Sequence, residues 1–185
     1  LAIPGILATL ALAPYVLHVF YSAEFLPATD IIRWQILGVA LRVVSWPLGF
    51  VILAKGRSRL FIFAEVVTAI LQVVLTLVCM RVWGLEGIGL SFMFLYLVHV
   101  FFIFFIICRL SGFVWTKRSW WLIATGVTAC AVTLAAVRFL PSLPALLVGL
   151  LLASVSIFIS ASLLKRMLGI DFSQMIRRRL KMMKK

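Results

Sequence analysis

Residues 31–53 read IIRWQILGVALRVVSWPLGFVIL, and this stretch decides the fold. A predominantly apolar helix of about 20 residues is long enough to cross a lipid bilayer. Arg42 nevertheless stands near the midpoint, where an arginine facing hydrocarbon would cost about 2.5–3.5 kcal/mol. Small or polar residues recur at steps of three and four and so share one helix face: Gln35, Gly38, Arg42, Ser45 and Gly49. The stretch therefore predicts a membrane-spanning helix with one face toward lipid and the other toward something polar.

The composition extends this prediction to a polytopic membrane protein. Of the 185 residues, 65% are hydrophobic, and the mean hydropathy is +1.22. Such values exclude a soluble globular domain. Apolar segments of roughly spanning length lie at residues 1–20, 31–54, 60–82, 87–109, 119–139 and 143–164. We expect an all-α transmembrane helix bundle over residues 1–168, with a kink at Pro4 or Pro14 in the first helix.

The distribution of charge indicates how these helices are oriented. The net charge is +13, which in a soluble protein would suggest a nucleic-acid partner. Most of the basic residues instead follow alternate apolar segments, at 55–59, 109–118, 165–166 and 177–185. By the positive-inside rule, both ends of the chain are cytoplasmic, and residues 21–30, 83–86 and 140–142 lie outside. We expect membrane lipids as partners and no nucleic acid.

Several local features follow from this topology. Thr29 or Asp30 is expected to cap the second helix, and Arg33 is expected to extend to the headgroups. His18 reads either as an interfacial residue or as a group that handles protons.

The basic stretch 169–185 reads as a separate cytoplasmic tail. Apolar residues recur in it at helical spacing, which predicts a short amphipathic helix on the membrane surface: Phe172, Ile176, Leu180 and Met183. A disordered tail that only fixes the topology is the alternative.

The third apolar segment carries a second polar face, made of Glu65, Thr68, Gln72 and Thr76. If the second and third helices form an antiparallel hairpin, Arg42 lies level with Gln72, and Glu65 lies about 10 Å away along the axis. The resulting seam between the two helices either lines a cavity or forms a buried structural network.

The fourth segment adds two kinds of residue to this picture. Gly84, Gly87 and Ser91 are small residues at helical spacing and predict a close approach between helices. Tyr96 and His99 share a face deeper in the membrane. His99 either forms a structural hydrogen bond or titrates.

Two passages resemble a known family of membrane transporters. Ala13-Pro14 and Tyr21-Ser22-Ala23-Glu24-Phe25, followed by Ala28, resemble the Ala-Pro and Tyr-Gly-x-Glu-Phe-x-x-Ala passage of Wzx-type O-antigen flippases, with Ser22 in place of glycine. Gly84-Leu85-Glu86-Gly87-Ile88-Gly89-Leu90-Ser91 resembles that family's Gly-x-x-Gly passage between two late helices. The resemblance covers roughly residues 10–110. It implies the last six of fourteen helices of a two-lobed exporter in the multidrug and oligosaccharidyl-lipid superfamily, in the bacterial inner membrane.

The resemblance also implies a function. Such a carrier moves an undecaprenyl-diphosphate-linked oligosaccharide to the periplasmic leaflet by alternating access, alongside polysaccharide polymerase and chain-length proteins. An arginine suits this cargo because its planar fork binds paired phosphate oxygens. We expect Arg42 to contact the diphosphate and Gln35, Gln72 and Tyr96 to bind sugar hydroxyls. Glu65 and His99 are the candidates for an ion pair with Arg42 or for a coupling proton.

Three other interpretations remain open. A multidrug or cation antiporter of the same superfamily would favour carboxylates over a central arginine. A membrane-embedded enzyme of polysaccharide synthesis would need clustered acidic residues or histidines and a sizeable loop. A purely structural subunit would leave Arg42 unexplained. Cys79, Cys108 and Cys130 are scattered, so we expect no metal, cofactor or disulfide. Transport without catalysis is the preferred hypothesis.

Overall fold

The computed structural model describes residues 2–21 and 23–168, and all regular structure in them is helical. The elements are α1 (Ala2–Phe20), the 3-10 turn η1 (Ala23–Phe25), α2 (Ala28–Ala54), α3 (Ser58–Trp83), α4 (Glu86–Ser111), α5 (Lys117–Phe139) and α6 (Ser142–Leu168). Six of these helices are long and apolar enough to cross a membrane. The predicted all-α bundle is therefore confirmed. The tail expected at 169–185 lies outside the described residues.

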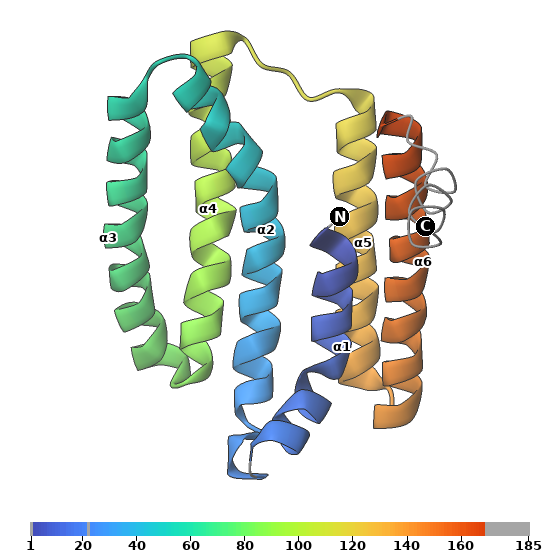
Figure 1. Cartoon of the computed structure of the whole chain (residues 1–185). Coiled ribbons are helices and arrows are strands. Elements are labelled where there is room, and N and C mark those ends of the chain that lie inside the picture. Colours follow the sequence, from blue (N-terminus) through green and yellow to red (C-terminus); the bar gives the residue numbers. More distant parts are fainter. Residues whose placement is uncertain (1, 22, 169–185) are drawn as a thin grey trace, which may run out of the picture.

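Successive helices run in opposite directions, so the connections alternate between two ends of the bundle (Figure 1). The α2–α3 turn, which holds Lys55 and Arg57, and the α4–α5 connection lie at one end. The α1–α2, α3–α4 and α5–α6 connections lie at the other end. This arrangement agrees with the alternation that the charge pattern indicates. Which end faces the cytoplasm remains a prediction.

The bundle consists of two groups of three helices. α4 lies between α2 and α3, whereas α1 packs against α5 and α6 (Figure 1). The contact of α1 with α2 joins the two groups. Ile6, Leu7 and Leu10 of α1 are buried with Cys130 of α5 and Ala153 of α6, and partly buried apolar residues of α2 pack against this core. A second core, formed by Leu48, Ile52, Ala64, Ile103 and Ile107, joins α2, α3 and α4 near the basic turn.

Small residues allow the closest approaches between helices, as the sequence predicts. Gly87 lies against the backbone of Cys79 on α3, and Ser91 is fully buried one turn further along. Gly149 of α6 lies against Ala11 of α1 in the same way. Gly84 has a different role, because it forms the α3–α4 turn with a positive φ of 59°. Side chains at these helix contacts would push the backbones apart.

One local expectation, the cap of the second helix, needs correction. α2 begins at Ala28, with Pro27 at its N-cap and no side-chain capping bond, so the predicted cap at Thr29 or Asp30 is wrong. Asp30 still places a negative charge in the first turn, at the positive end of the helix dipole. Figure 1 shows bends in α1 and in the last part of α2, and the helices contain Pro14 and Pro47 respectively.

Candidate functional site

Arg42 lies on α2 between two aromatic rings. Its guanidinium carbon is 4.9 Å from the ring centroid of Trp46 and 5.5 Å from that of Tyr96 on α4. The side chain is half-buried, and its Nε is fully buried without a hydrogen-bond partner. In the described part of the chain, no carboxylate pairs with this guanidinium. The rings stabilise the cation through their π faces, and they leave the N–H donors of its two terminal nitrogens available to an anion.

The small residues on the polar face of α2 serve packing. Gly38, Ser45 and Gly49 are buried. A Cβ added to Gly38 would lie 2.5 Å from Phe92 of α4, and one added to Gly49 would lie 3.2 Å from an aromatic carbon on α3. Gln35, in contrast, is exposed at the same helix edge as Arg42. The polar face is therefore narrower than the sequence indicates, because glycine and serine there allow helices to approach.

His99 is held by a directional hydrogen bond from α4 to α3. The Thr68 hydroxyl donates to the carbonyl of Ala64 over 2.7 Å, which leaves its oxygen free to accept. His99 Nδ1 lies 3.0 Å from that oxygen, so Nδ1 is the donor. Two roles are expected for His99, a structural hydrogen bond or titration. The structure supports the structural hydrogen bond. In the neutral ring this tautomer leaves Nε2 as an acceptor.

Gln72 belongs to a second network between α3 and α4. Its Nε2 donates to the Thr76 hydroxyl over 2.9 Å. Thr76 lies 3.1 Å from the hydroxyl of Ser91, which itself donates to the Ile88 carbonyl. The oxygen Oε1 of Gln72 is buried and has no partner in the described structure. These bonds fix α3 to α4 at membrane depth, where an unpaired polar group would be costly.

The direct seam predicted between the second and third helices is wrong, because α4 lies between them. The polar residues of α3 bond to α4, and α2 meets α3 mainly near their connecting turn. Glu65 is exposed, and within residues 2–21 and 23–168 no ion pair joins it to Arg42.

The candidate residues form one continuous group across three helices, which we call the Arg42 cluster: Trp46, Arg42, Tyr96, His99 and Thr68. Tyr96 contacts Arg42 of α2, and its ring lies 5.7 Å from the ring of His99. His99 in turn bonds to Thr68 of α3. Gln72 lies in the separate α3–α4 network, and Gln35 lies two turns from Arg42 along α2. The sequence reasoning missed Trp46, although a residue four positions after Arg42 in a helix is always its neighbour.

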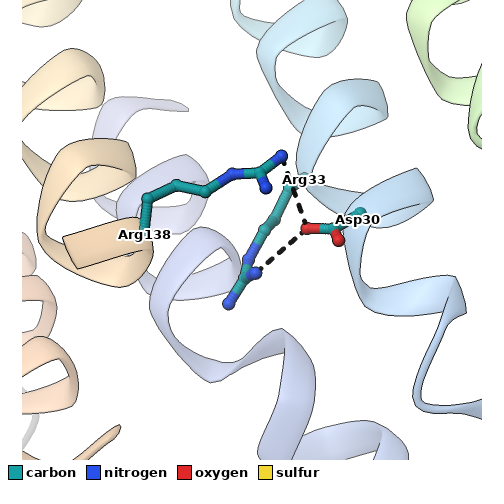
Figure 2. Close-up of polar contacts among 3 residues, drawn as sticks. All are labelled: Asp30, Arg33 and Arg138. Atoms are coloured by element: carbon teal, nitrogen blue, oxygen red, sulfur yellow. Dashed lines mark hydrogen bonds and ion pairs between the residues drawn. The ribbon is translucent and has the colours of Figure 1, made fainter. Parts of the chain in front are cut away.

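A second charged cluster lies near the start of α2 (Figure 2). Arg33 bonds to Asp30 over 3.1 Å, and Arg138 of α5 reaches the same carboxylate oxygen at 3.9 Å. The Arg33 side chain is only 14% exposed, so it is held inside the bundle and does not extend to the headgroups as expected. Asp30 thereby connects the two helix groups. No local pattern in the sequence indicates a contact between residues so far apart in the chain.

Comparison with known proteins relates the chain distantly to flippases. It is 26% identical over 108 residues to the lipid III flippase of Escherichia coli K12, and equally to that of Shigella flexneri. The matched region is 58% of this chain, and the chain spans about a quarter (25%) of the length of these curated relatives. No family model matches the chain, and no solved structure matches it significantly. The similarity is to flippases as a class and does not single out the O-antigen branch.

Proposed function

We propose that this chain is part of a transporter that moves a lipid-linked oligosaccharide across the bacterial inner membrane. The substrate class follows the relatives, whose name describes a lipid flippase. Alternating access between two helical lobes would carry the polar headgroup through the protein while its polyprenyl tail stays in lipid. The O-antigen or exopolysaccharide repeat unit is the specific cargo that we propose. Polysaccharide polymerase and chain-length proteins are then the expected partners.

The observation that carries the proposal is the environment of Arg42. An arginine in the middle of a spanning helix is usually paired with a carboxylate or faces water. Arg42 has no carboxylate partner in the described structure, and aromatic rings hold it on two sides. A diphosphate group would supply the missing anion and could accept paired hydrogen bonds from the guanidinium. Tyr96 then lies at the edge of the same surface, where sugar hydroxyls would be bound. Gln35 lies two turns from Arg42 along α2, on the side away from the α2–α3 turn.

The test is lipid transport by the complete protein, reconstituted in vesicles, with Arg42 replaced by alanine and by lysine. We expect Arg42→Ala to reduce transport at least tenfold and Arg42→Lys to restore part of it, because lysine keeps the charge but loses the fork. Arg109→Ala is the matched control, since Arg109 also lies over an aromatic ring, Phe105, but in the last turn of α4. Undiminished transport by Arg42→Ala would remove Arg42 from the mechanism.

A cation antiporter is the second candidate, because Glu65 is an exposed carboxylate within a spanning helix. Such a carrier would bind its cation at Glu65 and would tolerate the loss of Arg42. Uptake of a fluorescent cationic drug that Glu65→Gln abolishes and Arg42→Ala leaves unchanged would favour this function. We expect the opposite pattern with the lipid substrate.

A further inference from the structure

Trp46 is an exposed aromatic residue beside Arg42, the charged residue of the proposed substrate surface. Its side chain is 58% exposed even though it contacts the Arg42 guanidinium at 4.9 Å. One face of the indole therefore meets the cation, and a large part of the ring stays uncovered. A partner that contacts both groups at once must present an anion and an apolar surface within a few ångströms of each other.

A sugar diphosphate has this combination of groups. The axial C–H bonds of a pyranose ring form an apolar face that packs flat on an aromatic ring, and the first sugar is bonded directly to the diphosphate. Tyr96 lies on the other side of the guanidinium, with its ring centroid 5.5 Å away, and it carries a hydroxyl. Aromatic surface with a few placed polar groups is the usual composition of a small-molecule site.

We propose that Trp46 stacks on the first sugar of the lipid-linked substrate and so makes the site selective for glycosylated over bare polyprenyl diphosphate. This inference rests on the proposed function, because it takes Arg42 as the diphosphate contact. Trp46 lies one helical turn from Arg42 toward the basic α2–α3 turn. The sugar is therefore held on the side of the diphosphate that faces this turn, which the charge pattern predicts to be cytoplasmic.

The experiment measures the affinity of the purified complete protein for two probes, undecaprenyl diphosphate and undecaprenyl-diphospho-N-acetylglucosamine. We expect Trp46→Ala to weaken binding of the glycosylated lipid about tenfold more than it weakens binding of the bare diphosphate, because Trp46 also holds the Arg42 guanidinium. Trp46→Phe keeps a smaller ring and should lose less affinity for the glycosylated lipid. This variant also provides the test if Trp46→Ala fails to fold. Phe50→Ala is the matched control, because Phe50 is a 63% exposed aromatic residue one turn further along α2.

Two patterns of result separate this inference from the proposed function. If Trp46→Ala and Trp46→Phe bind both probes as the unaltered protein does, or lose both equally, Trp46 is not the sugar contact and the inference is overturned. If Arg42→Ala binds bare undecaprenyl diphosphate with unchanged affinity, the proposed function itself fails. Selective loss of the glycosylated probe in the Trp46 variants, with loss of both probes in Arg42→Ala, supports both.

Discussion

Replacing Gly89 by alanine should force α2 and α4 apart. A Cβ added to Gly89 would lie 2.5 Å from the carbonyl oxygen of Ile31 and 2.9 Å from Cβ of Trp34. Ordinary carbon–oxygen contacts are about 3.3–3.6 Å, so the helices must separate by about 1 Å. The nearest obstacle is backbone and cannot rotate away. Overpacking of this kind costs about 1–3 kcal/mol.

A control substitution isolates this cost from the gain in helix propensity. Gly5→Ala introduces the same side chain into α1, where nothing lies within 4 Å of the new Cβ. Both variants gain up to about 1 kcal/mol because alanine favours a helix over glycine. The difference in the free energy of unfolding between Gly89→Ala and Gly5→Ala should therefore be about 1–3 kcal/mol, with Gly89→Ala the less stable.

The assay is denaturant unfolding of the complete protein in detergent, with transport measured on the same samples. Transport should also fall in Gly89→Ala, because Tyr96 lies two turns from Gly89 on α4 and would move away from Arg42. Equal stability of the two alanine variants would contradict the close packing of α2 on α4, and with it the placement of Tyr96 beside Arg42.

Further substitutions test the other contacts. Asp30→Asn should lower the free energy of unfolding by about 1–3 kcal/mol, because it leaves the mostly buried Arg33 without its carboxylate. Arg138→Ala should cost less than about 1 kcal/mol in the same unfolding assay, since Arg138 is 47% exposed. Thr68→Val removes the acceptor of His99 Nδ1 and should cost about 1 kcal/mol. Its effect should vanish in a His99→Ala background, which a double-mutant cycle would measure.

Helix positions could be predicted from the sequence because hydrophobic length and turn residues determine them. The six expected segments match the observed helices to within a few residues, and the small residues Gly87 and Ser91 lie where helices meet. These features depend on short stretches of chain. The thickness of the membrane then sets the length of each helix. The need to pair every backbone polar group inside the bilayer excludes most structures other than helices.

The partners of each helix could not be predicted in the same way. Periodicity places Gln72 and Glu65 on one face of α3, but it does not say which helix that face meets. Chain order favoured α2, whereas the structure places α4 between α2 and α3. The ion pair between Asp30 and Arg138 joins helices distant in sequence, and no local pattern indicates it. Glycines such as Gly38 were ambiguous because they fit both a polar face and a tight helix contact.

The central claim is that the Arg42 face binds a diphosphate. A charged headgroup can reach this face only if the face is open to water. The direct measurement is the labelling rate of Gln35→Cys by a hydrophilic thiol reagent, in protein whose Cys79, Cys108 and Cys130 have been replaced. Gln35 is exposed and lies about 10 Å from Arg42 along α2. We predict ready labelling that undecaprenyl-diphospho-N-acetylglucosamine slows severalfold, with this protection lost in Arg42→Ala and kept in Arg109→Ala. No labelling, or protection that persists without Arg42, would contradict the account.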